Sequence, residues 1–363
     1  MGVDKVHIIG HNEFDINLTN ATYKEELFMK MKKLLCLSLS VLMVVSMVGC
    51  KKEEKKAETL KFGMGVVTEV SKAGNAEADA NGQGKTTTNV AVVTVDAEGK
   101  IVACQLDTSD ITVAYTGDGK AVANDSFATK YEQGDAYNMV AYGGAVKEWY
   151  QQADAFESVV AGKTLDEVKA LVAGEGKGTE DVINAGCTIT VTEFVQAIEK
   201  AYNNAVASDV TAEHTLKLGV STAQSCKDAT EEADGQNQLE TTFLAVAVDA
   251  EGKVVAATSD CVQVKFTFDA TGASTYDLTK AVSSKKEAGA NYGMSAYGTD
   301  LNGDGVIKEW FEQAAAFDAA CVSKTVAEIE ALVGTDGYGV ADLQTAGCTM
   351  AVSGFAKAAA KLK

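Results

Sequence analysis

The sequence predicts an α+β fold made of two tandem repeats, each an antiparallel sheet packed against helices. Three observations lead to this prediction. Short motifs recur in the same order in the two halves of the 363-residue chain, β-branched and apolar runs open each half, and apolar residues at helical spacing follow them. The matched motifs are Leu60-Lys-Phe-Gly with Leu216-Lys-Leu-Gly, Val95-Asp-Ala-Glu-Gly-Lys-Ile101 with Val248-Asp-Ala-Glu-Gly-Lys-Val254, and Lys147-Glu-Trp-Tyr150 with Lys308-Glu-Trp-Phe311.

The first part of each repeat is expected to be a β-hairpin. Residues 89–95 and 241–248 are β-branched and apolar runs, and an Asp-Ala-Glu-Gly-Lys turn follows each of them. Residues 101–106 and 254–258 then return antiparallel to the first strand. These hairpins should form the sheet of each repeat.

The second part of each repeat is expected to be helical. Apolar residues recur at helical spacing over 146–160 and 307–322. Thr164-Leu-Asp-Glu167 and Thr325-Val-Ala-Glu328 then read as capping boxes, in which a hydroxyl and a carboxylate satisfy backbone N–H groups at a helix start. After a short turn that both repeats share, a last helix over 192–202 or 353–362 closes each unit.

These patterns divide the chain into segments. Repeat 1 is expected over 60–204, a linker over 205–214 and repeat 2 over 215–363. Residues 50–59 should be a charged tether, because they contain too few apolar side chains to pack a core. Residues 1–49 are expected to be a spurious extension plus a lipoprotein signal peptide, with Met29 or Met31 as the true start.

The segment before the tether has the features of a targeting signal. Lysines 30, 32 and 33 precede an apolar run over 34–48, which is too short for a good membrane span. The Met-Val-Gly-Cys sequence at its end resembles a bacterial lipobox. Cys50 is therefore the predicted lipidation site, on the extracytoplasmic face of a bacterial membrane. An uncleaved anchor helix is the alternative, and it also places the repeats outside the cytoplasm.

Composition excludes several classes of function. Lys and Arg total 32 against 51 acidic residues, so the net charge of −19 argues against a nucleic-acid partner. Every basic residue is Lys, so an anion must be held by lysines, backbone N–H groups or hydroxyls rather than by a bidentate guanidinium. His7 and His11 precede the signal and His214 lies in the linker, which excludes histidine-based catalysis and metal sites.

One short turn occurs near the end of each repeat and is the candidate functional motif. It reads Ala-Gly-Cys-Thr over 185–188 and again over 346–349, and it is called the repeated turn below. Gly186 and Gly347 allow a tight bend or a close backbone approach, and a helical pattern follows. The hydroxyls of Thr188 and Thr349 are expected near a helix start, where a phosphate is well placed. The alternative is a connection inherited by both copies from one ancestral unit.

The repeated turn resembles the Ser-Gly-Ala-Thr signature of the extracytoplasmic FMN-binding domains, in which the last Thr carries FMN through a phosphoester bond. The glycine and the final threonine agree with that signature, and the order of valine-rich strand, Asp-x-x-Gly-Lys turn and closing motif is also similar. Alanine and cysteine stand at the other two positions of the turn, where the family has Ser or Thr and Ala. The family's acidic residue has its counterparts in Asp181 and Asp342, one position further upstream.

The resemblance implies a covalent FMN on Thr188 or Thr349, attached by a flavin transferase. Tyr142 and Tyr297, in matching Ala-Tyr-Gly segments, are then candidates to stack on the flavin ring. The alternative for these tyrosines, and for Trp149 in the following helical segment, is an ordinary place in the core. Only short motifs of each repeat carry the resemblance.

Repeat 2 contains an extra loop that is a candidate calcium site. Asp300-Leu-Asn-Gly-Asp-Gly fits the first six positions of a calcium loop, with Asp300, Asn302 and Asp304 as the ligands. Position 12 of such a loop is a bidentate Glu or Asp, but here it is Phe311. A plain Asn-Gly and Asp-Gly turn is the alternative.

Six cysteines remain after Cys36 and Cys50, and no disulfide framework or zinc spacing is shared by the two repeats. The first functional hypothesis is therefore a membrane-anchored, extracytoplasmic electron carrier that bears flavin and passes electrons between redox partner proteins. The second is a flavin-free surface lipoprotein that acts as a binding or structural module. Neither hypothesis requires a catalyst with a substrate of its own.

Overall fold

The computed structural model describes residues 57–298 and 305–362, and these described residues belong to one compact unit. Its architecture confirms the predicted α+β class, since antiparallel sheets pack against helices in both repeats. The predicted boundaries between repeat 1, linker and repeat 2 stay a prediction. Residues 206 and 207 of the predicted linker add a short strand to the sheet of repeat 1.

The sheet of repeat 1 has three long strands and two short edge strands. Strands β1 (Lys61–Gly74), β2 (Gly82–Val95) and β3 (Ile101–Tyr115) form an antiparallel meander. Strands β4 (Ala121–Val122) and β5 (Val206–Ala207) pair with the outer edges of β3 and β1. The strand order is β4-β3-β2-β1-β5.

The sheet of repeat 2 repeats the meander without the short edge strands. It contains β6 (Thr215–Lys227), β7 (Gly235–Val248) and β8 (Val254–Phe268) in the order β6-β7-β8. Gly99 and Gly252 have φ values of 80° and 78° in the turns that precede β3 and β8, so the predicted hairpin turns are confirmed.

The helices follow the strands in each repeat, as the apolar spacing predicts. Helices α4 and α9 start at the tryptophans of the repeated Lys-Glu-Trp motif. In repeat 1 the helices are α2 (Lys130–Gln133), α3 (Met139–Gly143), α4 (Trp149–Val160), α5 (Leu165–Lys169), α6 (Glu180–Ala185) and α7 (Thr192–Asn203). In repeat 2 they are α8 (Lys285–Ala288), α9 (Trp310–Cys321), α10 (Val326–Glu330), α11 (Ala341–Thr345) and α12 (Ser353–Ala359).

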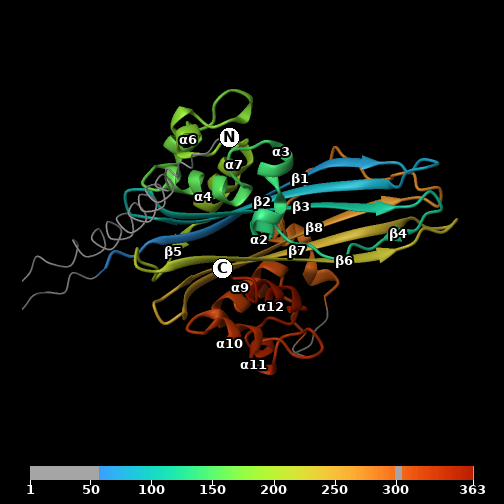
Figure 1. Cartoon of the computed structure of the whole chain (residues 1–363). Helices are drawn as coiled ribbons and strands as arrows, with labels where there is room; N and C mark the ends of the chain where they lie inside the picture. Colours follow the sequence, from blue (N-terminus) through green and yellow to red (C-terminus); the bar gives the residue numbers. More distant parts are fainter. Residues whose placement is uncertain (1–56, 299–304, 363) are drawn as a thin grey trace, which may run out of the picture. The chain divides into compact units, whose positions relative to one another are not determined.

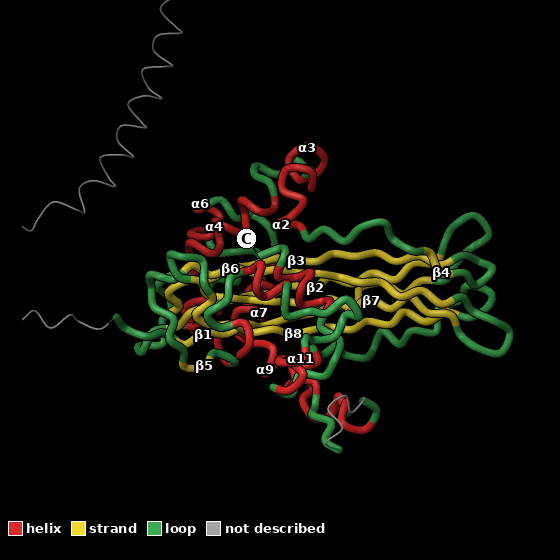
Figure 2. Tube along the Cα trace, turned by 90° about the horizontal axis from the view of Figure 1, so that it is seen from below, coloured by secondary structure: helices red, strands yellow, loops and turns green. Residues whose placement is uncertain are grey.

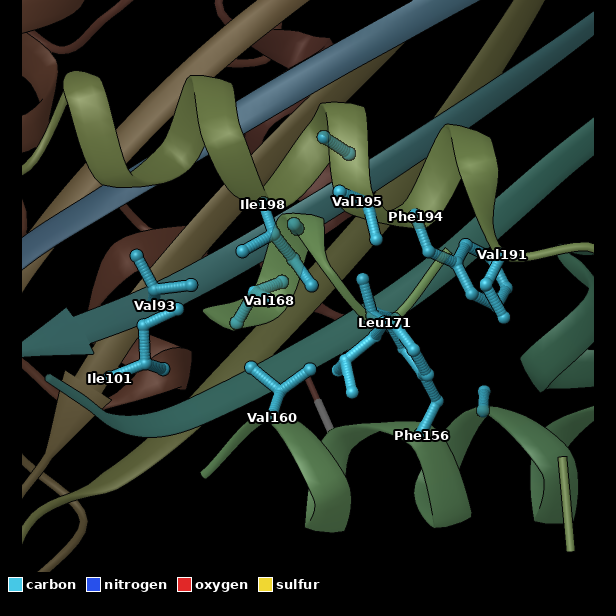
Figure 3. Close-up of a cluster of buried hydrophobic side chains, with 14 of the residues drawn as sticks. Val93, Ile101, Phe156, Val160, Val168, Leu171, Val191, Phe194, Val195 and Ile198 are labelled. Carbon is cyan, nitrogen blue, oxygen red and sulfur yellow. The ribbon is translucent and has the colours of Figure 1, made fainter. Parts of the chain in front are cut away.

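The two sheets lie between the two groups of helices, which gives four layers (Figure 1). Each group of helices packs on the outer face of its own sheet through a separate hydrophobic cluster. Figure 3 shows the cluster of repeat 1, where Val93 and Ile101 of the sheet meet Phe156 and Ile198 of the helices. A third cluster fills the space between the sheets and takes side chains from both repeats.

The burial pattern of strand β2 reflects these layers. Residues 82–87 alternate between buried and half-buried, whereas residues 88–95 are buried on both faces. Figure 2 shows the reason, since helices cover one half of the long strands and the other half runs on to the hairpin loops near β4. A strand covered on both faces reads as a continuous apolar run, which is why 89–95 was the stretch predicted as strand.

The two repeats make reciprocal contacts with one another. Lys200 of α7 pairs with Glu287 of α8, and Lys361 after α12 pairs with Glu132 of α2 at 2.9 Å. Asn124 donates its backbone N–H to Gln224 of repeat 2 at 2.7 Å. The repeats are thus held together by a shared core and by polar contacts that run in both directions.

The backbone corrects one motif match. The sequence pairs Gly63 with Gly219, but the structural equivalent of Gly219 is Gly65. A Cβ on Gly65 would lie 2.3 Å from the carbonyl oxygen of Ala197 in α7, and one on Gly219 would lie 1.9 Å from that of Ala358 in α12. Because strand side chains alternate with period 2, a two-residue slip keeps every residue on its own face and leaves the alternation unchanged.

Candidate functional site

The glycine of the repeated turn ends a helix. Gly186 has φ 107° and caps α6, with its N–H donated to the carbonyl of Ile183 at 2.9 Å. The N–H of Cys187 reaches the carbonyl of Val182 at 3.1 Å, and Gly347 ends α11 with φ 98°. The left-handed conformation explains why both copies have glycine here.

A lysine side chain lies across each of these glycines. The Nζ atom of Lys147 donates to the carbonyl of Ala185 at 3.3 Å, and a Cβ on Gly186 would stand 2.1 Å from that nitrogen. Lys308 takes the same place over Gly347, also at 2.1 Å. The lysine of the Lys-Glu-Trp motif therefore supplies a positive charge to the repeated turn.

The threonines of the repeated turn are half-buried and bonded to a glutamine. Thr188 donates both its N–H and its hydroxyl to Oε1 of Gln152, at 2.8 and 3.0 Å. Thr349 does the same to Gln313, at 2.8 and 3.2 Å. Helix α7 begins only at Thr192, and Val191 precedes it without a side-chain cap, so the Thr188 hydroxyl is positioned by Gln152 rather than by a helix start.

These glutamines are functional residues that the sequence reasoning missed. Gln152 and Gln313 are fully buried, and the amide nitrogen of each donates to the carbonyl of the motif lysine at 2.9 Å. A signal was present, because a glutamine stands at the same position after the tryptophan in Lys-Glu-Trp-Tyr-Gln-Gln152 and Lys-Glu-Trp-Phe-Glu-Gln313.

The cysteines of the repeated turn are fully buried. Burial raises the pKa of the Cys187 thiol to about 11 and that of the Cys348 thiol to about 12. Both side chains therefore stay protonated at neutral pH, and they act as small apolar residues rather than as nucleophiles.

A pocket of about 380 Å³ lies beside the repeated turn of repeat 1, and it is called the repeat-1 pocket. Ile189 and Thr190, the residues that follow Thr188, form part of its wall. Its volume lies in the range of about 300–1,000 Å³ that is usual for small-molecule sites. The other lining residues come from the sheet and the helices: Glu69, Thr87, Asn89, Thr108, Lys130, Met139, Trp149, Lys177, Glu193 and Phe194.

Asn89 is the most unusual residue of the repeat-1 pocket. It lies on β2, is 6% exposed, and accepts the hydroxyl proton of Thr108 through Oδ1 at 2.6 Å. Its amide nitrogen donates no hydrogen bond to any residue that the structure describes. The nitrogen is therefore open to the pocket, where the acceptor atom of a ligand can take its N–H.

Two lysines give the repeat-1 pocket its cationic groups. Lys130 lies 3.6 Å from Asp110, and Lys177 donates to the carbonyl of Thr188 at 3.1 Å. Trp149 and Phe194 form a buried aromatic wall, with ring centroids 5.8 Å apart in an edge-on arrangement. The pocket thus combines an apolar aromatic wall, an amide donor and positive charge.

The tyrosines predicted to stack on a ring lie outside the pockets. Tyr142 of α3 is 89% exposed, and Tyr297 is 62% exposed with its ring 6.1 Å from that of Tyr292. Neither contributes to the walls described here. Trp149, for which a core position was the alternative, is both a core residue and a pocket wall.

Repeat 2 has a smaller pocket of about 220 Å³ at the equivalent place, called the repeat-2 pocket. Thr242 replaces Asn89, Cys261 replaces Thr108 and Lys285 replaces Lys130. Trp310 and Phe355 provide the aromatic wall. This volume lies below the usual range for a small-molecule site.

Several predicted residues lie outside the described part of the chain. These are the lipidation candidate Cys50 and the calcium candidates Asp300, Asn302 and Asp304. Over residues 57–298 and 305–362, no group of His, Cys, Asp and Glu side chains has the arrangement of a metal site. Within the same ranges, every helix is too short or too polar to cross a membrane.

Comparisons with protein-family models, with curated proteins and with solved structures find no match to this chain. The site geometry and the residue chemistry therefore carry the functional argument alone. Fold class by itself does not indicate function, since one fold can hold many unrelated sites.

Proposed function

We propose that the protein is an extracytoplasmic binding module, anchored to a bacterial membrane through Cys50, whose repeat-1 pocket takes one small ligand. The observation that carries this proposal is the Asn89 amide nitrogen, a donor that opens on the 380 Å³ cavity and has no acceptor among the described residues. A ligand oxygen at this place would accept this N–H in exchange for water, and such a hydrogen bond contributes about 0.5–1.5 kcal/mol net.

The lining supports one class of ligand. The aromatic wall of Trp149 and Phe194 suits a flat apolar body, and Asn89 suits a carbonyl oxygen on that body. Lys130 and Lys177 suit a negative group at the other end of the molecule. A small heteroaromatic anion meets all three conditions.

A titration with a panel of such anions tests the proposal. FMN, uridine monophosphate and nicotinate each combine a flat ring, an oxygen acceptor and a negative charge. In the Trp310→Phe variant, Trp149 is the only tryptophan of the chain, so its fluorescence reports on the repeat-1 pocket. At least one member of the panel is expected to change this fluorescence saturably. A flat response to the whole panel at millimolar concentration contradicts the proposal.

A flavin carrier is the second candidate function, and the position of Thr188 favours it. Ile189 and Thr190 line the repeat-1 pocket directly after Thr188, and Lys177 contacts both the pocket and the Thr188 carbonyl. Asn89 would meet a ring carbonyl, the aromatic wall would hold the ring and Thr188 would carry the phosphate. The bound flavin would supply one- or two-electron transfer to redox partner proteins.

This second proposal is confined to Thr188. The repeat-2 pocket beside Thr349 has only about 220 Å³, and the nearly buried side chain of Lys285 forms part of its wall. Mass spectrometry of the intact protein, produced together with a flavin transferase, tests the idea. A single flavin-phosphate adduct that disappears in Thr188→Val supports it. An unmodified chain, or an adduct that Thr349→Val removes, contradicts it.

A further inference from the structure

Two equivalent lysines take different positions in the two pockets. Lys130 is the first residue of α2 and Lys285 is the first residue of α8, and a capped hydroxyl residue precedes each of them. Both lysines line their pockets. Their surroundings differ, and this difference accounts for which pocket is open.

Lys285 is held inside the repeat-2 pocket. Its side chain is 8% exposed, and its Nζ atom lies 3.3 Å from a carboxylate oxygen of Glu240. The same nitrogen lies 5.2 Å from the ring centroid of Tyr292 and 5.7 Å from that of Trp310. Two aromatic faces and a carboxylate therefore enclose the ammonium group, as they would enclose a cationic ligand.

Lys130 is held at a different side of its pocket. Its Nζ atom lies 3.6 Å from Asp110, which also pairs with Lys85 at 3.3 Å. It lies 5.4 Å from the ring of Tyr137, the counterpart of Tyr292. Among the described residues Lys130 makes no matching contact with Trp149, so the tryptophan face of the repeat-1 pocket is left clear.

The carboxylate that pairs with each lysine comes from the same cross-strand residue pair in the two repeats. Thr87 of β2 faces Asp110 of β3, and at the equivalent place Glu240 of β7 faces Gln263 of β8. The acid is on β3 in repeat 1 and on β7, the equivalent of β2, in repeat 2. Thr87 and Glu240 line their pockets, whereas Asp110 and Gln263 do not.

We infer that the position of the acid in this pair decides whether the pocket accepts a ligand. In repeat 2, Glu240 stands on the pocket wall and draws Lys285 in, so the side chain occupies the cage as an internal ligand. In repeat 1, Asp110 stands outside the wall and holds the Lys130 side chain, which is 14% exposed, away from the tryptophan, so its charge on the pocket wall is available to an anion. Asp110 is thus a positioning residue, and the consequence for binding rests on the function proposed above.

Exchanging the pair tests the inference without any ligand. Thr87→Glu with Asp110→Gln gives repeat 1 the pattern of repeat 2, and Glu240→Thr with Gln263→Asp does the reverse. In protein labelled with ε-¹³C lysine, a methylene above two aromatic rings resonates further upfield than one above a single ring. The Lys130 signal is expected to move upfield in the first variant, and the Lys285 signal downfield in the second. Lys130→Arg and Lys285→Arg assign the signals.

A matched control separates charge from side-chain size. Thr87→Gln with Asp110→Gln removes the acid from β3 and places none on β2, so the Lys130 signal should not take the upfield position. Equal upfield movement in this control, or no movement in either exchanged variant, would overturn the inference. The two exchanges are independent, so one that fails to fold leaves the other as the test.

The panel titration then separates this inference from the proposed function. The Thr87→Glu, Asp110→Gln variant is expected to bind the best panel ligand at least tenfold more weakly than the parent, because Lys130 fills its site. Unchanged affinity in a variant whose Lys130 signal has moved would overturn the link to binding. If the lysine signals exchange as expected but the parent binds no panel ligand, the proposed function fails and the positioning role of the pair stands.

Discussion

In each repeat, one glutamine side chain holds the repeated turn in place through hydrogen bonds. Gln152 accepts two bonds from Thr188 and donates to the carbonyl of Lys147, so one buried amide joins α4 to the turn before α7. Gln313 repeats this arrangement for Thr349. The repeated turn is therefore held by the same glutamine–threonine hydrogen bonds in both repeats. The two repeats differ in the pocket beside the turn, which is larger next to Thr188 than next to Thr349.

Gln152→Ala is expected to lower the free energy of unfolding by about 2–4 kcal/mol. The change leaves the Thr188 N–H without its acceptor and opens a cavity at a fully buried position. Gln196→Ala, at an exposed position of α7, should cost less than about 1 kcal/mol. Urea titration of the two variants measures the difference. Similar midpoints would show that the buried amide does not hold the turn.

Glu157 is a titrating group outside the pocket. Burial raises its pKa to about 8, from 4.5, and its carboxylate accepts the N–H of Leu106 at 2.7 Å. The nearby charges of Asp154 and Asp107 act in the same direction. The folded state therefore keeps a proton that the unfolded chain releases, so the stability that Glu157 contributes is fully present below about pH 4.5 and is lost as the pH rises to about 8.

Glu157→Gln is expected to remove this pH dependence. A glutamine oxygen can still accept the Leu106 N–H, and no charge is then buried at high pH. The variant should be more stable than the parent by about 2–5 kcal/mol at pH 8.5 and equally stable at pH 4.5. Thermal melts across this range measure the effect, with the exposed Glu231→Gln as the control. Parallel curves for parent and Glu157→Gln would contradict the assignment.

At the scale of elements, the glycine pair on β1 and β6 sets the approach of the closing helices. Gly65 faces the backbone of α7 and Gly219 faces that of α12, at distances that leave no room for a methyl group. Strand and helix can pack this closely only where the strand lacks a Cβ. The close approach brings α7 and α12 onto the outer faces of their sheets.

Gly65→Ala is therefore expected to destabilise the protein by about 2–3 kcal/mol, since the new methyl group would meet backbone atoms of α7 that cannot move alone. Gly74→Ala on the same strand is the matched control. There the nearest atom is the end of the flexible Lys72 side chain at 3.4 Å, so the cost should stay below about 1 kcal/mol. Equal denaturation midpoints would contradict the proposed close packing.

The elements show which features the sequence could predict. The hairpin turns, the capping boxes at Thr164 and Thr325, and the closing helices are set by local patterns and are found in the structure. The outer halves of the long strands, such as 82–88 of β2, were not predicted, because glycine, glutamine and lysine interrupt the strand signal and only its last three residues are β-branched threonines. These halves form strands because they pair with neighbouring strands, and the sequence of one segment alone does not indicate such pairing.

The candidate site was less predictable than the fold. The repeated turn drew attention to Thr188, but the pocket beside it depends on Asn89 and Lys130, which lie far from the turn in the sequence. Only tertiary packing brings them together. Tyr142 was predicted as a site residue, but its side chain is exposed. The Ala-Tyr-Gly match between the repeats does not indicate which way the tyrosine side chain points.

At the scale of the whole molecule, the repeats share a core. The cluster between the sheets includes Val92 of β2, Phe243 of β7 and Val210 of the predicted linker, all of them buried. Separating the repeats would expose this cluster to water. Apolar burial is the main favourable term in folding, so each repeat depends on the other for part of its stability.

The shared core predicts that the two repeats unfold together. Trp149 reports on repeat 1 and Trp310 on repeat 2, and the variants Trp310→Phe and Trp149→Phe isolate each signal. Each variant has its own stability, so the comparison is made within a variant, between tryptophan fluorescence and far-ultraviolet circular dichroism. One coincident transition is expected in both. Two separate transitions in either variant would contradict a shared core.

The dissociation constant of the best panel ligand, measured in parent, Asn89→Ala and Thr242→Ala proteins, tests the central claim most directly. Asn89 and Thr242 are equivalent positions, and only Asn89 lines a pocket of small-molecule size. The loss of one donor should weaken binding about tenfold in Asn89→Ala, since about 1.4 kcal/mol corresponds to that factor. Thr242→Ala should leave the constant unchanged. Equal constants for parent and Asn89→Ala would contradict a binding site in repeat 1.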